Sequence, residues 1–293
     1  MGRIIASDSG NLDLFIEYDK RQKRIVCYSG GHSSAIVAIE VCRRYGSENV
    51  VLLNHDIAEN VEDLDIKRFK REVADYLGKE IVFANIQDLE GDALPDQFDV
   101  CIKAGAFKVG SGSELCTSRL KTEPFYKWLS ENTDPANTVI YYGFDPKEIR
   151  RIQRRSGILG SMGYRTDYPL ALWKDRTIFN TGEIGIDPPL AYGKYKHANC
   201  KGCLKAGRLH WFITYCDRPD LFEKAKRAED EIGYTILNGQ SMESLEPTFR
   251  KLQEAGVEGN EHIGGVSFWS QVKRSGVLLE PDSEDLKPCE CVF

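Results

Sequence analysis

A Gly-Gly turn between a buried strand and an amphipathic helix constrains the fold of this chain most. Residues 24–29 form an apolar, β-branched run, and residues 34–45 repeat apolar side chains at helical spacing. The turn between them reads Ser29-Gly30-Gly31-His32-Ser33-Ser34. Glycines allow close backbone approach to an anion, and the free N–H groups of the following helix attract it. The segment predicts a phosphate-binding loop, and the alternative is a turn that only caps the helix.

The rest of the chain continues the strand–helix alternation that is typical of a parallel sheet covered by helices. Further strands are expected at residues 50–54, 80–84 and 138–143, and further helices at residues 61–77, 122–129 and 146–155. We therefore expect an α/β fold with a doubly wound, mostly parallel sheet. After about residue 165 loops dominate, followed by helices at residues 209–215, 219–232 and 245–255. The predicted organisation is an N-terminal extension (1–20), a nucleotide-binding α/β domain (21–185) and a Cys-containing region with a helical C-terminal cap (186–293).

Composition restricts the compartment and the partners. The 39 basic and 45 acidic residues give a formal net charge of −6, so a nucleic acid would need a local basic patch. No segment reaches the roughly 20 apolar residues of a membrane span, and the N-terminus lacks the apolar run of a secretory signal. We therefore expect a cytoplasmic protein that does not bind membranes. Its nine cysteines are then expected to be reduced thiols.

Several ordered motifs resemble the PP-loop ATP pyrophosphatase superfamily, which includes the reductases of phosphoadenosine phosphosulfate (PAPS). The Ser29–Ser34 turn resembles the S-G-G-x-D-S loop of that superfamily, and the resemblance extends over residues 22–220. The other matching segments are Asn54-His55-Asp56-Ile57-Ala58-Glu59-Asn60, Cys116-Thr117-Ser118-Arg119-Leu120-Lys121, Tyr142-Gly143-Phe144-Asp145 with Glu148 and Arg151, and Tyr168-Pro169-Leu170-Ala171-Leu172-Trp173. The resemblance implies a PP-loop, HUP-like fold.

The resemblance also implies ATP and Mg²⁺ as ligands. It assigns the phosphates to the loop and the adenosine to the segments after the second and fourth strands. The implied nucleotide-binding residues are Ser29, Gly30, Gly31, Ser33, Ser34, Asn54, Asp56, Gly143, Phe144 and Arg151. Two positions depart from the family pattern. Ser33 replaces the usual Asp and leaves magnesium binding open, whereas Gly30 replaces the Phe or Leu of PAPS reductases and favours ATP cleavage.

The chemistry that this branch implies is adenylation of an oxygen, with release of pyrophosphate, followed by sulfur transfer. Cys116 is the candidate sulfur carrier, with Asp56 and Lys121 as further catalytic residues. Arg119 and Lys121 lie close in sequence, and a helix is expected to begin after Cys116, all of which favour a thiolate. The alternative for Cys116 is a small core cysteine. Cys27 and Cys42 are predicted to be core residues.

A second group of cysteines has several interpretations. Cys200 and Cys203 form a C-x-x-C pair between His197 and His210. The pair suits a Cys₂His₂ zinc site, a [4Fe–4S] cluster shared with Cys116, a redox or persulfide relay, or plain loop cysteines. The terminal Cys289-x-Cys291 resembles the C-terminal cysteine of PAPS reductases but lacks the Gly-Leu-His that follows it, so we expect a frayed tail.

The function predicted from these features is ATP-dependent thiolation of a small heterocycle such as a nucleobase, as in 6-thioguanine-forming members. The alternatives are a PAPS reductase and a non-catalytic nucleotide-binding protein. A sulfur-donor enzyme is an expected partner, the acidic charge argues against tRNA, and a homodimer is expected. A basic helix with Lys147, Arg150, Arg151, Arg154 and Arg155 is either a solvated face or a phosphate-binding element.

Overall fold

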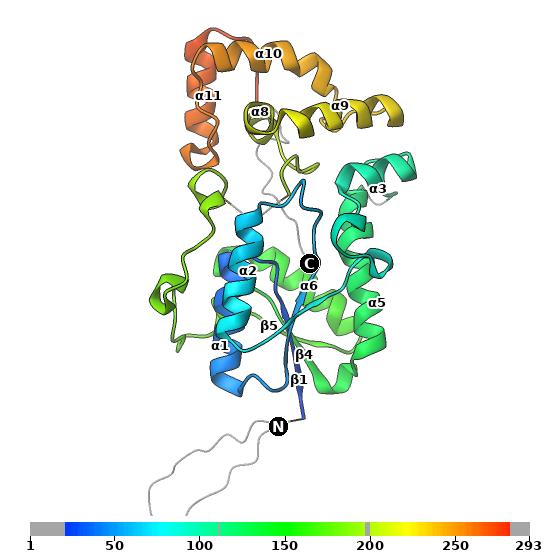
Figure 1. The fold of residues 1–293 in the computed structure, drawn as a ribbon, viewed down its shortest axis with the longest axis vertical. Helices are drawn as coiled ribbons and strands as arrows, with labels where there is room; N and C mark the ends of the chain where they lie inside the picture. Colours follow the sequence, from blue (N-terminus) through cyan, green and yellow to red (C-terminus); the bar gives the residue numbers. More distant parts are fainter. Residues whose placement is uncertain (1–20, 111, 197–199, 282–293) are drawn as a thin grey trace, which may run out of the picture.

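A five-stranded parallel sheet forms the centre of the molecule. The computed structural model describes residues 21–110, 112–196 and 200–281. The strands are β1 (Lys23–Cys27), β2 (Val50–Asn54), β3 (Ile81–Phe83), β4 (Thr138–Tyr141) and β5 (Arg165–Asp167). Their order is β3-β2-β1-β4-β5, and every neighbouring pair is parallel (Figure 1). The α/β class and the parallel sheet are therefore confirmed.

Helices cover both faces of this sheet because strand residues alternate between the faces. Val26 of β1 packs with α1 (His32–Tyr45) and α2 (Leu64–Tyr76). Ile25 and Cys27 face the other side and pack against α5 (Glu123–Asn132) and α6 (Ile149–Ser161). The remaining helices of this part are α3 (Gln97–Ala104), α4 (Leu115–Thr117) and α7 (Pro169–Leu172). Short 3₁₀ turns lie at Ile86–Asp88, Gly91–Ala93, Pro135–Asn137, Pro146–Glu148, Thr181–Ile184, Leu190–Gly193 and Glu261–Ile263.

A helical cap lies beyond the carboxyl ends of the strands (Figure 1). It consists of α8 (Arg208–Asp217), α9 (Pro219–Ile232), α10 (Met242–Glu254) and α11 (Gly264–Ser275). Its core is aromatic and is continuous with Phe98 and Cys101 of α3 and with Leu115 of α4. One hydrophobic cluster therefore joins the cap to α3 and α4, and the two faces of the sheet pack in clusters of their own.

The helix expected at residues 122–129 is longer than predicted. It begins at Leu115, passes through the π-helical turn Ser118–Thr122 and continues as α5 to Asn132. Pro124 indicated a helix start in the sequence, because proline lacks an N–H and its ring crowds the carbonyl of residue i−4. The wider π turn includes that residue, Leu120, and lets the helix continue upstream of the proline.

Candidate functional site

The predicted phosphate loop joins β1 to α1 at the carboxyl edge of the sheet. Helix α1 begins at His32 with Gly31 as its N-cap. Within the loop, the Ser34 hydroxyl donates to the Gly31 carbonyl (2.8 Å) and lies 3.2 Å from the Ser29 hydroxyl. Ser29 and Ser33 are exposed. The loop thus combines a helix N-terminus with exposed hydroxyls, which is an arrangement suited to an anion.

Close packing fixes the shape of this loop from two sides. Gly30 has a φ of +82°, and a Cβ built there would lie 2.6 Å from Cγ and Cδ of Lys70. Gly143 follows β4, and a Cβ at that position would lie 3.0 Å from the Ser33 carbonyl carbon and the Ser34 nitrogen. The turns after β1 and β4 are therefore in direct backbone contact.

That contact marks the topological switch point of the sheet. From β1 the chain passes outward to β2 and β3, and then returns to the other side of β1 as β4. In open α/β sheets, ligands bind beyond the carboxyl ends of the strands at such a point. The loop and the Gly143–Asp145 turn border it, as the sequence predicted from two separate motifs.

A cluster of charged side chains, Asp56, Glu62, Lys67 and Lys70, lies next to the loop, and Lys70 packs against Gly30. Lys70 Nζ donates to both Glu62 oxygens (3.0 and 2.9 Å), and Lys67 Nζ donates to Asp56 (2.9 Å). Glu62 and Lys70 are almost fully buried. Burial raises the pKa of Glu62, and the charge of Lys70 opposes that rise. Sequence reasoning missed this cluster, although Lys67 and Lys70 lie three residues apart on the helix face that the hydrophobic pattern buries.

Hydrogen bonds to residues after β1 and β3 hold the residues at the end of β2 in place, which the sequence did not indicate. The Asn54 amide donates to the Tyr28 carbonyl, and its oxygen lies 3.5 Å from Lys70 Nζ. His55 is buried, with Nδ1 against the Ala84 carbonyl. Desolvation by burial lowers the pKa of His55 to about 3, so the ring is neutral at physiological pH. Asp56 is half-buried and lies beside Lys67.

Phe144 and Arg151 form part of an aromatic stack at the other border of the switch point. The Phe144 ring stacks on Tyr142 (5.1 Å between centroids) and Tyr168 (6.0 Å), and it is buried. The Arg151 guanidinium lies 4.4 Å from the Phe144 centroid and pairs with Glu148. The Phe144 ring and Glu148 therefore fix the position of the Arg151 guanidinium.

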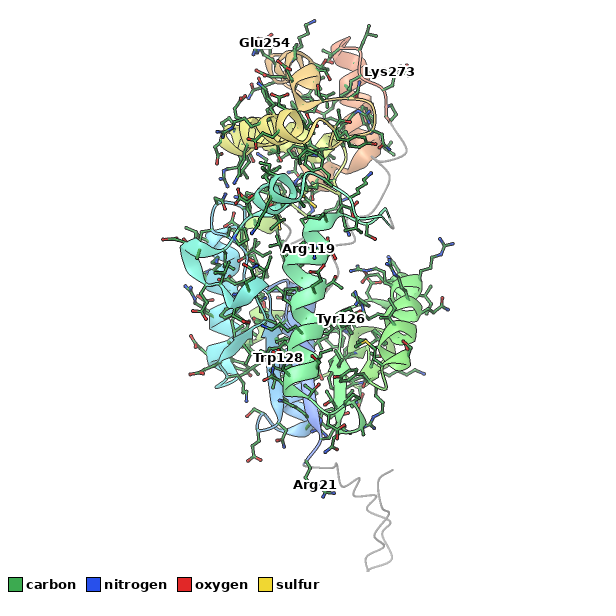
Figure 2. The ribbon with its side chains drawn as sticks, turned by 90° about the vertical axis from the view of Figure 1, so that its right-hand side faces the viewer. Arg21, Arg119, Tyr126, Trp128, Glu254 and Lys273 are labelled. Atoms are coloured by element: carbon green, nitrogen blue, oxygen red, sulfur yellow. The ribbon has the colours of Figure 1, made fainter. Side chains whose placement is uncertain are left out.

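Cys116 lies in the first turn of α4, at the end of the α4–α5 helix that is nearer the cap (Figure 2). The helix carries Cys116 and does not start after it. The thiol is half-buried against the core shared with the cap. Arg119 is committed to Glu123 (2.7 and 2.8 Å) and half-exposed, so its charge is balanced by a carboxylate. Lys121 acts electrostatically on His55, which places it towards the end of β2.

The structure describes Cys200, Cys203 and His210 of the predicted Cys₂His₂ site. His210 Nε2 accepts from the Cys203 N–H (3.2 Å), and Nδ1 contacts Glu261 (2.9 Å), so both ring nitrogens are used. No group of three His, Cys, Asp or Glu side chains that could hold a metal occurs within residues 21–110, 112–196 and 200–281. Cys203 is buried and Cys200 is half-buried. His197, Cys289 and Cys291 lie outside the described residues.

Cys27 and Cys42 lie in the core, as predicted. Burial raises the pKa of Cys27 to about 12 and that of Cys42 to about 11. Neither thiol is therefore ionised near neutral pH, which leaves Cys116 as the better candidate for thiolate chemistry.

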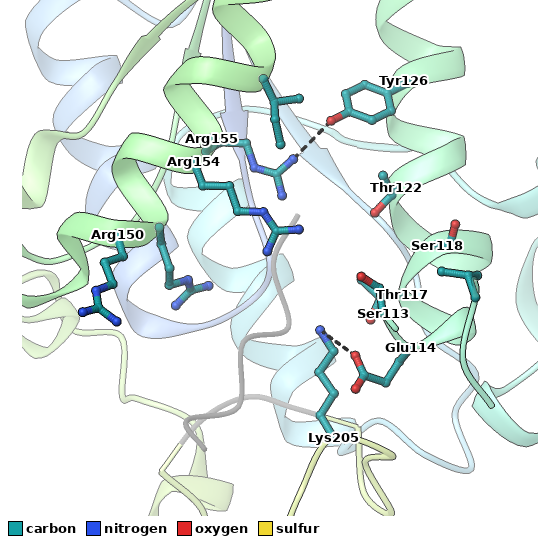
Figure 3. Close-up of a pocket in the computed structure, with 13 residues that line it drawn as sticks. Ser113, Glu114, Thr117, Ser118, Thr122, Tyr126, Arg150, Arg154, Arg155 and Lys205 are labelled. Carbon is teal, nitrogen blue, oxygen red and sulfur yellow. Dashed lines mark hydrogen bonds and ion pairs between the residues drawn. The ribbon is translucent and has the colours of Figure 1, made fainter. Parts of the chain in front are cut away.

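A cationic cavity of about 410 Å³ lies between α6 and the α4–α5 helix (Figure 3). Arginines of α6 line one wall, and hydroxyl groups line the other. The lining residues are Val109, Ser113, Glu114, Thr117, Ser118, Thr122, Tyr126, Arg150, Arg151, Arg154, Arg155, Ile158 and Lys205. The sequence singled out the arginines and gave them two interpretations. It missed the hydroxyl wall, whose only signal is the density of Ser and Thr between residues 113 and 122.

Comparison with known proteins returns no match to this chain among family models, curated proteins or solved structures. Among the described residues, no helix is both long enough and apolar enough to cross a membrane.

Proposed function

We propose that this protein binds ATP at the switch point and acts as a PP-loop ATP pyrophosphatase that transfers sulfur to a small acceptor. The contact between the turns after β1 and β4 carries this proposal. It unites, at one carboxyl edge, the two glycine turns that the sequence resemblance assigns to the phosphates and the adenosine. A turn that only caps a helix would not need the second glycine against its backbone.

The proposed reaction has two steps. An acceptor oxygen attacks the α-phosphorus of ATP, and pyrophosphate leaves with the bonding electron pair. The terminal sulfur of a persulfide on Cys116 then attacks the activated carbon, and AMP leaves with the former acceptor oxygen. An external thiol attacks Cys116 Sγ, which releases the thiolated product and leaves a mixed disulfide for reduction.

The residues near the loop have defined tasks in this scheme. The Ser29 and Ser33 hydroxyls bind and orient the phosphates, together with the loop amides other than that of His32, which donates to the Tyr192 hydroxyl (2.9 Å). Lys121 adds positive charge at the end of β2. Mg²⁺ would neutralise phosphate charge, and the oxygens of Ser33 and Asp56 are ligands of the kind it prefers. Lys70 and Glu62 support the loop from beneath.

The experiment measures three properties of the wild type and of Cys116→Ser. These are MgATP affinity by calorimetry, pyrophosphate release with candidate acceptors, and mass gain of one sulfur atom after incubation with a cysteine desulfurase and cysteine. Cys116→Ser should bind MgATP normally but lose the sulfur adduct and product formation, because a hydroxyl does not carry sulfane sulfur.

Each alternative gives a different result. Sulfite release from PAPS without pyrophosphate release from ATP would identify a sulfonucleotide reductase. ATP binding without turnover of any acceptor would indicate a non-catalytic nucleotide-binding protein. Cys27→Ser serves as a thiol control, because its buried side chain should not accept sulfur in either case.

A further inference from the structure

The cavity beside the switch point carries an excess of positive charge. Five cationic side chains and one carboxylate line it, in a chain whose net charge is −6. The carboxylate, Glu114, pairs with Lys205 at 3.3 Å. The remaining cations are the four arginines of α6, of which Arg151 pairs with Glu148.

Arg150 and Arg154 have no neutralising carboxylate among the described residues. Both are exposed, and neither has a hydrogen-bond or ion-pair partner among the residues that the structure describes. They lie four residues apart on one helix face, where like charges destabilise a helix. Arg151 Nε is also buried without a hydrogen-bond partner in the described part of the chain. A bound anion would balance these charges and satisfy that donor.

The wall opposite the arginines offers hydroxyl groups. Thr117 and Thr122 line the cavity, and neither hydroxyl has a hydrogen-bond partner within the described residues. The Tyr126 hydroxyl accepts from Arg155 Nη1 at 3.4 Å. In Figure 3 the threonines and Tyr126 lie across the cavity from Arg154 and Arg155. Guanidinium groups facing hydroxyls form a donor set for phosphate oxygens.

We infer that this cavity binds the phosphate group of the acceptor, so that the acceptor is a phosphorylated small molecule of nucleotide size and not a free nucleobase. This inference rests on the proposed function for the identity of the ligand as acceptor. None of the loop residues Ser29–Ser34 lines the cavity, so ATP phosphates on that loop leave it available. Its volume falls in the range of about 300–1,000 Å³ typical of small-molecule sites.

The test compares nucleoside 5′-monophosphates with their nucleosides by calorimetry, on the wild type and on the double variant Arg150→Ala/Arg154→Ala. A monophosphate should bind the wild type and its nucleoside should bind much more weakly. The double variant should lose about 10- to 100-fold in monophosphate affinity, because two charge-assisted contacts are removed. MgATP affinity should be unchanged.

Arg71→Ala/Arg227→Ala is the matched control. Arg71 of α2 and Arg227 of α9 are also exposed, do not line the cavity and have no hydrogen-bond or ion-pair partner among the described residues. The control removes the same charge and should leave monophosphate affinity unchanged. Equal losses in both double variants would mean that only net charge acts, and would overturn the inference.

Other outcomes separate this inference from the proposed function. Equal affinity for monophosphate and nucleoside, or no monophosphate binding, refutes the phosphate site while ATP binding stands. A parallel loss of MgATP affinity in Arg150→Ala/Arg154→Ala assigns the cavity to ATP and refutes the inference. If the wild type binds RNA but no monophosphate, and Arg150→Ala/Arg154→Ala loses the RNA binding, the inference is also refuted. The wild type could also bind the monophosphate but not ATP, with the monophosphate lost in Arg150→Ala/Arg154→Ala. That result supports the phosphate site and rejects only the proposed function.

Discussion

The buried side chain of His55, at the end of β2, should make the unfolding free energy depend on pH. Its folded-state pKa is about 3, against an ordinary value of 6.5. Between these values the unfolded chain binds a proton at this residue and the folded chain does not. Stability contributed by the neutral ring is therefore complete above pH 6.5 and falls as the pH decreases.

The expected loss from His55 is about 2 kcal/mol of unfolding free energy between pH 8 and pH 5. Urea denaturation at both pH values measures it, with His55→Asn as the comparison. The variant should lose less stability than the wild type over the same interval, since it removes this titration and keeps the others. An identical pH dependence in both proteins would show that the ring is protonated without cost in the folded state.

Individual residues were predicted best where the local pattern alone decides their role. Gly30 and the core cysteines Cys27 and Cys42 follow from the strand, the turn and the helix around them. The partners of Lys70 and Arg119 do not, because Glu62 lies in the bend before α2 and Arg119 lies upstream of the predicted start of its helix. Arg119 looked like a thiolate-stabilising cation from sequence proximity, and the structure pairs it with a carboxylate instead.

Helices and strands were predicted where their own sequence determines them, and were missed where contacts with distant segments do. The long apolar strands β1, β2 and β4 were predicted within two residues at each end. Strand β5, with the sequence Arg-Thr-Asp, was missed because it lacks apolar residues and is defined only by pairing with β4. Helix α3 and helix α11 were also missed. The amphipathic face of α3 packs against α9, which is more than a hundred residues away in sequence.

The two turns at the switch point yield a prediction about glycine substitutions. Gly143→Ala would push a methyl group against the loop backbone at 3.0 Å, so it should displace Ser33 and Ser34 and weaken MgATP binding. Gly157→Ala in α6 meets no atom within 4 Å. It should leave MgATP binding unchanged and stabilise the protein by about 0.8–1.0 kcal/mol through helix propensity.

Calorimetry and urea denaturation of both alanine variants check this prediction. Unchanged MgATP affinity in folded Gly143→Ala would mean that the turns touch without forming a binding site. Substitution of Gly30 is less informative, because its φ of +82° and the Lys70 side chain beneath it would disturb the fold as well as the loop.

At the scale of the whole molecule, the sheet and the cap together define where chemistry can occur. The cap lies beyond the carboxyl edge, and the shared core of α3, α4 and the cap helices holds it there (Figure 1). The switch point and the cationic cavity lie at this edge of the α/β part, and the helix that carries Cys116 begins at its end nearer the cap (Figure 2). The opposite edge carries the starts of the strands and none of the residues assigned to the site.

A crystal structure with Mg²⁺ and a non-hydrolysable ATP analogue would show whether the switch point binds ATP. Triphosphate oxygens should lie within hydrogen-bond distance of Ser29–Ser34, and the adenosine should lie beside the Gly143–Asp145 turn. A nucleotide bound at the amino ends of the strands, or a well-ordered loop without nucleotide at saturating concentration, would contradict it.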